Sequence, residues 1–485
     1  MLFNSFQFAV FLPIVFVLYW FVFNRSLRIQ NFFLLLCSYY FYSCWDWRFL
    51  FLLAFSTFLD YFSGLKIYRT PSQQGRKFWL ILSVGINLGF LGIFKYYNFF
   101  AASFAEMMLT GFHYQIQIST LNILLPVGIS FYTFHGLSYV FDIYNKKIEP
   151  STNFVQYSLF VSFFPLLVAG PIERATHLLP QVEKERIFSY TQAIDGLRQI
   201  LWGLFKKVVI ADNCAQIANI IFNDSSHYSG SALILGAVMF AFQIYGDFSG
   251  YSDIALGTAR LFGFELLRNF SYPYFSRDIA EFWRRWHISL SSWFKDYLYF
   301  PLGGSRLGMM KTVRNTFIIF LVSGFWHGAN WTFVVWGGLN ALFIIPSVIF
   351  KTNRNNLETV AQGKFLPTIK ELMQILTTFS LTVFAWIFFR ADSIGHAFSF
   401  IKGIISKTVL SNPFKYNELT SAKVYILLLI PFFLIEWLGR EHKYALAKLT
   451  LRWPRMLRWS FYAILFFTIG MYMQTAATQF IYFQF

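Results

Sequence analysis

The chain has 485 residues, of which 56% are hydrophobic and only 13% charged, and its mean hydropathy is +0.49. Soluble globular proteins carry about 25% charged residues, so this composition excludes a soluble enzyme and indicates an integral membrane protein. The formal net charge of +17 raises the alternative of a nucleic-acid partner, which the positions of the basic residues decide.

Twelve mostly apolar stretches predict twelve membrane crossings of an all-α polytopic membrane protein. They are residues 5–23, 30–44, 49–65, 78–94, 121–141, 208–222, 231–248, 315–333, 334–350, 366–389, 423–438 and 459–480. A further run, 154–169, lies between basic loops and is predicted to be re-entrant. No repeat or soluble domain is visible, so we expect one membrane domain over residues 1–485.

The basic residues of the first half gather on one side of this twelve-span scheme. The loop 101–120, which falls on the other side, contains no Lys or Arg. Because cytoplasmic loops are rich in Lys and Arg, the basic side is predicted to be cytoplasmic and both termini to lie outside. The charge is then explained without nucleic acid. The basic residues are Arg25, Arg28, Lys66, Arg69, Arg76, Lys77, Lys146 and Lys147.

Residues 281–294 read EFWRRWHISLSSWF and combine tryptophans with arginines and a histidine. On a helix, Trp283, Trp286 and Trp293 form one stripe, while Arg284 and His287 share another face. Tryptophan prefers the membrane interface, and arginine can lie along apolar surface with its head group in water. The pattern predicts one interfacial helix at the cytoplasmic boundary.

A second histidine, His327, lies in the run 315–350, which has 36 residues without Asp, Glu, Lys or Arg. A straight helix of that length would extend about 54 Å against a hydrocarbon core of about 30 Å, so the run is expected to break near residues 328–331. A titratable ring at membrane depth is costly unless it faces a cavity or the bundle interior, which favours a functional role. The structural alternative is a hydrogen bond to a carbonyl of a neighbouring helix.

Five stretches in order resemble the membrane-bound O-acyltransferase family, in particular its bacterial branch that includes alginate O-acetyltransferases. They are MLFNSFQFAVFLPIVFVLYWF at the start, QIYGDFSGYSDIALGTARLFGF at 243–264, RDIAEFWRRWHISLSSWFKDYLYFPLGGSR at 277–306, LVSGFWHGANWTFVVWGGLNAL at 321–342 and the terminal FIYFQF at 480–485. The resemblance covers nearly the whole chain.

This resemblance implies a funnelled helical bundle with a tunnel, in which His327 is the principal catalytic residue and His287 the second histidine, nearer the cytoplasmic opening. Two residues depart from the related pattern: Lys295 stands where Arg is usual before the Asp, and Ser305 where Asn is common. Neither position is a histidine, so the departures leave the reaction class intact.

The implied chemistry is acyl transfer from a thioester, with acetyl-CoA as the expected donor, and no metal constellation is visible. Burial disfavours the His327 cation, so a mostly neutral ring can act as general base toward an acceptor hydroxyl. Asn330 and Trp331 are candidates to stabilise the oxyanion, and Asp296 either orients a histidine or pairs with a nearby cation. Candidates to bind the donor phosphates, or alternatively anionic lipid, are Arg268, Arg277, Arg284, Arg285, Arg306 and Lys311.

Tyr482 carries the only hydroxyl of the terminal FIYFQF segment. The segment could serve as an aromatic anchor at the membrane interface. Related bacterial systems carry a similar motif, which implies that Tyr482 relays the acyl group to a periplasmic or extracellular acetyltransferase or directly to a polysaccharide.

The leading interpretation is an O-acetyltransferase of the bacterial inner membrane that modifies an exported or cell-envelope polysaccharide. The close alternative is D-alanyl transfer to teichoic acid from a carrier protein. A transporter or flippase without chemistry is an alternative of a different class, in which the polar residues line a substrate path.

Overall fold

The computed structural model describes residues 1–121, 124–167, 170–473 and 480–481, and all regular elements within these ranges are helical. The prediction of an all-α protein is confirmed for this part of the chain. The chain divides into two compact units. The first contains residues 1–189, 262–266 and 328–330, and the second contains the remainder.

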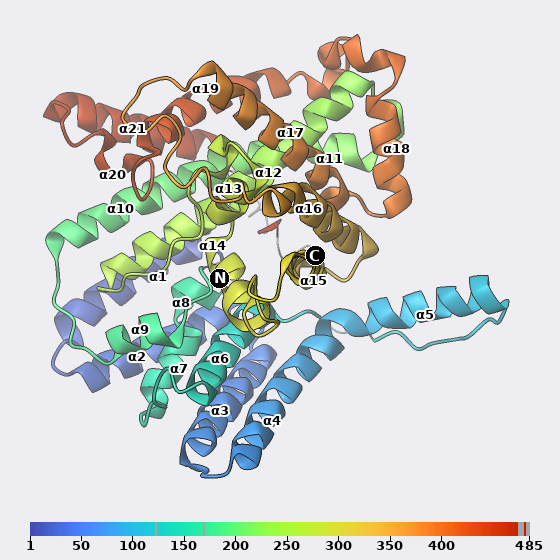
Figure 1. The fold of residues 1–485 in the computed structure, drawn as a ribbon. Coiled ribbons are helices and arrows are strands. Elements are labelled where there is room, and N and C mark those ends of the chain that lie inside the picture. The colour runs from blue at the N-terminus through green and yellow to red at the C-terminus, as the bar shows by residue number, and fades with distance from the viewer. Residues whose placement is uncertain (122–123, 168–169, 474–479, 482–485) are drawn as a thin grey trace. The chain divides into compact units, whose positions relative to one another are not determined.

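The first unit is built from nine α-helices, which Figure 1 colours from blue to green-blue. They are α1 (Phe6–Val17, continued by the π-helical turn Leu18–Val22), α2 (Leu27–Ser43), α3 (Arg48–Arg69), α4 (Gln73–Leu91), α5 (Tyr97–Phe112), α6 (Ile129–Tyr144), α7 (Phe154–Ser162), α8 (Phe164–Leu167) and α9 (Ala175–Val182).

A buried polar cluster joins α3 to α4 in this unit. The Asp60 carboxylate oxygen Oδ1 accepts hydrogen bonds from Ser83 Oγ (2.6 Å) and Asn87 Nδ2 (2.8 Å), and Ser56 donates to Asn87 Oδ1 (2.6 Å). A side chain at Gly136 of α6 would overlap Asp60, so only glycine lets α6 approach at this point. Buried polar groups between apolar helices need such partners, and they fix which faces meet.

The second unit contains the remaining α-helices. They are α10 (Tyr190–Leu204), α11 (Asp212–Asn223), α12 (Gly230–Leu261), α13 (Ile279–Arg285), α14 (Ile288–Phe294), α15 (Met309–His327), α16 (Trp331–Ile349), α17 (Ile369–Arg390), α18 (Ile394–Ile404), α19 (Ala422–Gly439), α20 (Leu446–Leu449) and α21 (Arg455–Tyr472). Two π-helical turns matter below: η3 (Phe205–Ala211), between α10 and α11, and η6 (Lys295–Tyr299), after α14.

Paired glycines allow α10 to pack directly along α12 at the centre of the second unit (Figure 1). A Cβ atom at Gly203 would lie 2.6 Å from the Gly250 carbonyl oxygen, and one at Gly250 would lie 2.8 Å from the Gly203 carbonyl oxygen. Gly196 and Gly257 meet in the same way two turns further along. Small residues at matched positions let the two helix backbones approach closely.

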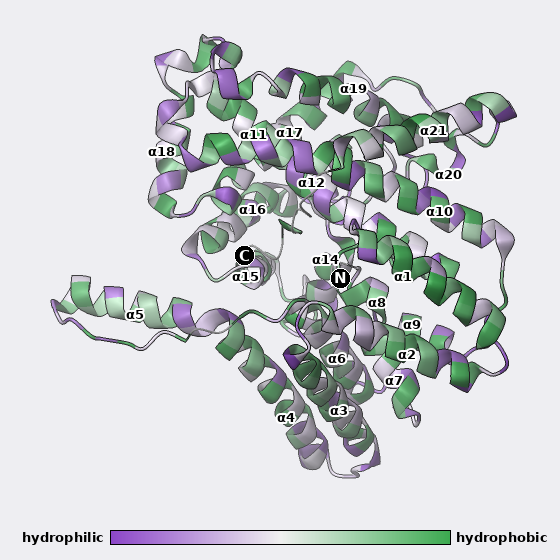
Figure 2. Cartoon of the chain, turned by 180° about the vertical axis from the view of Figure 1, so that it is seen from behind, coloured by the Kyte–Doolittle hydropathy of each residue, from purple (hydrophilic) through white to green (hydrophobic). Residues whose placement is uncertain are grey.

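Six helical segments of the described chain are long and apolar enough to cross a membrane. They are Arg48–Arg69, Gln73–Phe112, Gly230–Leu261, Trp331–Ile349, Ile369–Arg390 and Asn417–Gly439. Figure 2 shows how hydrophobic residues dominate helices such as α4. Each of the other predicted crossings overlaps a helix that does not meet this length or composition, so the count of twelve stays a prediction.

The stretch 101–120, expected to be a loop, differs from that expectation in its first half. Residues up to Phe112 form α5, which continues α4 through the π-helical turn Gly92–Tyr96. The segment lacks Pro and is rich in Ala, Met and Phe, so nothing in it stops helix propagation from α4. No residue of α5 is buried.

The glycine contact between α10 and α12 gives a test of this packing. Gly203→Ala forces a methyl group against the Gly250 carbonyl, and we expect it to destabilise the protein by about 1–3 kcal/mol. The matched control is Gly85→Ala on α4, where an added Cβ meets nothing within 4 Å. Thermal unfolding in detergent measures both variants. Equal melting temperatures for the two would contradict the close approach.

Candidate active site

The EFWRRWHISLSSWF stretch is two short helices rather than the single helix predicted. Helix α13 ends at Arg285, α14 begins at Ile288, and His287 between them has a left-handed backbone (φ 43°, ψ 54°). The break is held by the Ile288 N–H, which donates to the Asn269 carbonyl (2.9 Å). A histidine in this conformation is uncommon, and such strain is found where surrounding structure requires a particular direction of the side chain.

The same stretch is buried rather than interfacial. Trp286 and His287 are each 1% exposed, and Trp293 is 7% exposed. The predicted stripe assumed an unbroken helix, whereas the turn at His287 places Trp286, His287 and Trp293 in the interior of the second unit and leaves Arg284 exposed. Trp286 packs on Trp386 of α17 (ring centroids 5.1 Å apart), which explains why its ring is not at a membrane surface.

His287 lies in an apolar environment. Its ring packs edge-on against Phe248 (4.6 Å between centroids), and Trp326 lies 5.9 Å away. Neither ring nitrogen has a hydrogen-bond partner among the described residues. Burial lowers the pKa of His287 to about 3, so the ring is neutral at physiological pH. A neutral imidazole with both nitrogens available can donate one hydrogen bond and accept another.

His327 is the last residue of α15, and α16 begins at Trp331. The predicted break of the long apolar run near residues 328–331 is therefore confirmed. Two glycines hold these helices together, because a side chain at Gly324 would overlap the Phe333 carbonyl and one at Gly337 the Phe320 carbonyl. The partial negative charge at a helix C-terminus favours a nearby positive charge, so this position supports a ring that takes up a proton during a reaction.

Aromatic rings surround His327, which is 3% exposed. Trp336 of α16 lies 5.1 Å away and Phe389 of α17 5.3 Å away, both edge-on to the imidazole. Trp386 stacks on Trp336 with 5.5 Å between centroids. We call Trp336, Trp386 and Phe389 the aromatic wall. It fixes the ring and excludes water around it.

The two histidines lie in the same interior, with 6.5 Å between ring centroids. They come from segments forty residues apart in the sequence, α15 and the junction of α13 and α14. Their environments differ, because one is a neutral ring in an apolar contact and the other caps a helix C-terminus. Two imidazoles in different environments suit a reaction in which one moves a proton and the other orients or hydrogen-bonds a reactant.

The remaining predicted polar residues are described by their position in the chain and their burial. Asn330 lies in the connection 328–330 and is partly buried. Trp331 is the first residue of α16 and is 53% exposed. Asp296 lies in η6 and is half-buried. The predicted acyl relay, Tyr482, lies outside the described residues.

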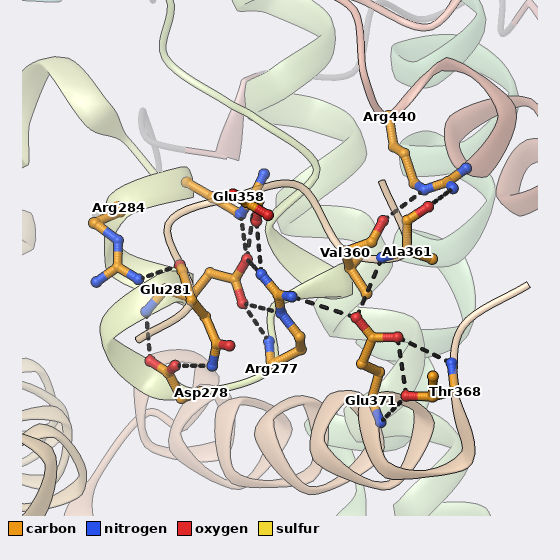
Figure 3. A network of polar contacts seen from close by, with 12 residues as sticks. Arg277, Asp278, Glu281, Arg284, Glu358, Val360, Ala361, Thr368, Glu371 and Arg440 are labelled. Atoms are coloured by element: carbon orange, nitrogen blue, oxygen red, sulfur yellow. Dashed lines mark hydrogen bonds and ion pairs between the residues drawn. The ribbon is translucent and has the colours of Figure 1, made fainter. Parts of the chain in front are cut away.

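Three of the predicted donor-binding arginines bind the protein itself (Figure 3). Arg277 pairs with Glu281 (3.1 Å) and Glu371 (3.4 Å), and Arg285 pairs with the other oxygen of Glu281 (2.8 Å). Arg284 donates to the carbonyls of residues 353 and 356 (2.6 and 2.7 Å).

These arginines fix the loop between α16 and α17. Arg277 and Arg285 both donate to the Glu358 carbonyl, and Arg440 donates to the carbonyls of Val360 and Ala361 (Figure 3). Glu281 is 1% exposed, so each arginine that leaves it would increase the uncompensated buried charge.

Arg306 and Arg268 have different surroundings from these three. Arg306 is exposed. Arg268 lies over the Tyr272 ring (5.2 Å) with its Nε lacking a hydrogen-bond partner among the described residues. It lines a polar pocket whose charged lining residues are Lys206, Asp253, Arg268, Glu436 and Lys443.

Lys206 and Lys207 are site residues for which the sequence offers little signal. They adjoin the predicted span 208–222, where the positive-inside rule would place them at a membrane boundary. The structure buries them to 3% and 1% exposure in η3. Lys206 pairs with Asp253 (2.5 Å) and Lys207 with Asp247 (2.7 Å), so the two aspartates of the GDFSGYSD stretch hold one lysine each.

Comparison with known proteins identifies the family of this chain. The model of the membrane-bound O-acyltransferase family matches residues 133–390. The chain is 39% identical to the probable alginate O-acetylase AlgI of Pseudomonas aeruginosa, over 83% of this chain and 74% of the relative. It is 36% identical to the peptidoglycan O-acetyltransferase of Helicobacter pylori, over 84% of this chain and 80% of the relative.

A more distant similarity extends to the teichoic acid D-alanyltransferase of Bacillus subtilis, which is 26% identical over 57% of this chain and 71% of the relative. The family match includes both histidines, the GDFSGYSD stretch and three of the arginines that fix the loop after α16, namely Arg277, Arg284 and Arg285. The chain is therefore a multi-pass membrane acyltransferase and belongs to the membrane-bound O-acyltransferase family.

Proposed function

We propose that this chain transfers acetyl groups from cytoplasmic acetyl-CoA across a bacterial inner membrane for O-acetylation of an exported or cell-envelope polysaccharide. The observation that carries the proposal is the pair of buried histidines 6.5 Å apart, in a chain whose relatives include O-acetyltransferases over most of their length. Both termini face outward in this proposal, and the loop that contains Arg284 faces the cytoplasm.

His327 acts as the general base. Its ring takes the proton of an acceptor hydroxyl, the oxygen attacks the thioester carbonyl, and the carbon–sulfur bond breaks. The thiolate leaves and receives the proton that His327 holds, so acceptor and donor become an acetyl ester and free coenzyme A. The position of His327 at the C-terminus of α15 supports the positive charge that forms on the ring.

His287 stays neutral throughout the cycle and hydrogen-bonds the thioester or the acceptor. Its low pKa, caused by burial, supports this assignment, because a ring with a pKa of about 3 is a poor base at pH 7. The carbonyl oxygen becomes an oxyanion during attack. Asn330, the Trp331 indole and backbone N–H groups of the connection 328–330 remain the proposed donors to that oxyanion.

Arg268 and Arg306 are the stronger proposals for binding the phosphates of coenzyme A. Arg306 is exposed, and Arg268 has an unsatisfied Nε at a polar pocket. Arg277, Arg284 and Arg285 stay candidates, but their hydrogen bonds to Glu281 and the loop carbonyls favour a structural contribution. Phosphate groups bind best to guanidinium groups whose N–H donors are available.

Tyr482 receives the acetyl group first and passes it on to a periplasmic or extracellular acetyltransferase or to the polysaccharide itself. The burial of Phe480 (0% exposed) and Ile481 (2% exposed) supports this proposal, because an aromatic anchor at a membrane surface would expose these side chains.

The central test is release of free coenzyme A by the purified protein in lipid vesicles with an acceptor present. We expect His327→Ala to lower the rate by about 10²–10⁴-fold, because it removes the base. His287→Gln should lower kcat. In the profile of rate against pH, the midpoint of the fall toward acid pH should stay unchanged, since burial lowers the pKa of His287 to about 3. If the native protein releases no coenzyme A from acetyl-CoA but frees the thiol of a D-alanyl carrier protein, the D-alanyl reaction is favoured.

The relay is tested by the hydroxyl of Tyr482. Tyr482→Phe keeps the ring and removes only the acyl-accepting oxygen, so transfer of labelled acetyl to an external acceptor should fall to background. The control is Tyr472→Phe at the end of α21, which should retain full transfer. If Tyr482→Phe transfers acetyl at the native rate, Tyr482 is no relay.

The arginines are separated by measuring KM and stability together. Arg306→Ala should raise the KM for acetyl-CoA about 10–100-fold by loss of charged hydrogen bonds, with an unchanged melting temperature. Arg285→Ala should lower the melting temperature, because it leaves Glu281 buried with one guanidinium partner instead of two. A KM increase for Arg285→Ala at native stability would instead assign Arg285 to the donor.

A further inference from the structure

Phe480 and Ile481, which follow α21 in the sequence, lie in the interior of the second unit, and we call these two residues the C-terminal segment. The Ile481 backbone N–H donates a hydrogen bond to Asp247 Oδ2 at 2.7 Å, although the two residues are 234 positions apart. This bond is buried, with Ile481 2% and Asp247 3% exposed. A side chain of α12 therefore holds the backbone of the C-terminal segment directly.

The segment lies close to the histidine pair. The Phe480 ring packs on Tyr251 (4.7 Å between centroids) and on Phe248 (5.7 Å) of α12. Phe248 in turn contacts the His287 ring at 4.6 Å. Only one aromatic side chain thus separates Phe480 from His287.

The negative charge on Asp247 strengthens its hydrogen bond to the Ile481 backbone N–H. Lys207 pairs with both Asp247 (2.7 Å) and Asp212 (2.8 Å), and all three side chains are at most 6% exposed. One cation between two carboxylates leaves the group with a net negative charge. The Ile481 N–H supplies a further donor to Asp247, and a hydrogen bond to a charged acceptor in a dry interior is stronger than one between neutral groups.

We infer that Asp247 is a positioning residue that holds the C-terminal segment beside His287 through the Ile481 N–H, with Lys207 orienting the Asp247 carboxylate. Tyr482, the proposed relay, follows Ile481 directly in the sequence, so this bond holds the residue that precedes it. The catalytic consequence rests on the proposed function, whereas the structural role of Asp247 does not.

The variant that tests this inference is Asp247→Asn. It removes the charge that attracts the Ile481 N–H and leaves Lys207 paired with Asp212 as a neutral pair, so folding should be retained. The matched control is Asp212→Asn, which removes the other carboxylate of Lys207 and leaves the bond between Asp247 and Ile481 in place.

The first measurement is the rate at which a charged maleimide labels Ile481→Cys. The full-length protein carries alanine at Cys37, Cys44 and Cys214 and is labelled in detergent micelles. Loss of a charged hydrogen bond should make the segment open at least about 10-fold more often. Labelling should therefore be at least about 10-fold faster in Asp247→Asn. Labelling in Asp212→Asn should stay at the native rate. Equal labelling rates in native protein and Asp247→Asn would overturn the inference.

A second variant removes the same hydrogen bond without touching the buried charges. Ile481→Pro lacks the backbone N–H, and its effect is measured by labelling of Phe480→Cys with and without the proline. Faster labelling with proline supports the bond, even if Asp247→Asn fails to fold. Unchanged labelling contradicts it.

The catalytic consequence is read from the kinetics of coenzyme A release. Asp247→Asn should lower kcat about 10-fold and leave the KM for acetyl-CoA unchanged, because the donor does not bind through Asp247. A merely destabilised protein would lose active sites in both aspartate variants. Faster labelling without a change in kcat would support the inference that Asp247 positions the segment, but it would contradict the proposed relay through Tyr482.

Discussion

The second unit depends on two lysines that are buried between helices and paired with aspartates of α12. Lys206 and Lys207 are adjacent in η3, and a π-helical turn directs them to Asp253 and Asp247. Burying a charge is costly, so each lysine requires its carboxylate close by. The glycine pairs Gly203–Gly250 and Gly196–Gly257 bring α10 and α12 to the separation at which these pairs form.

The ion pairs and the histidines are linked through α12. Asp247 and Phe248 are neighbours on this helix, and Phe248 contacts both His287 and Phe480. Arginines play a corresponding part at α13, where Arg277 and Arg285 share the buried Glu281 and hold the loop after α16. The EFWRR stretch therefore carries its arginines chiefly to fix α13 and that loop, while the tryptophans fill the interior.

The sequence predicts the helical class, the break after His327 and the two histidines as site residues, because apolar runs and isolated titratable residues are strong signals in a membrane chain. It does not predict that residues 281–294 break at His287. Helical periodicity assumes a continuous helix, whereas the break depends on Asn269, which is distant in sequence. The sequence pattern also does not show which charged residues form ion pairs. Lys206 and Lys207 therefore resemble ordinary charges at a membrane boundary until the structure places Asp253 and Asp247 beside them. The crossings outside the six long helices and the place of Tyr482 remain predictions from the sequence.

The different environments of the two histidines follow from where the backbone ends its helices. His327 closes α15, where the partial negative charge of a helix C-terminus favours a nearby cation, and His287 occupies a strained turn against Phe248, where burial lowers its pKa. If the two histidines exchanged roles, the general base would lie in the apolar contact with Phe248, and the neutral hydrogen-bonding ring would lie at the negative end of a helix. In the proposed reaction the backbone thus determines which imidazole accepts the proton of the acceptor hydroxyl, and the aromatic wall keeps water from competing for it.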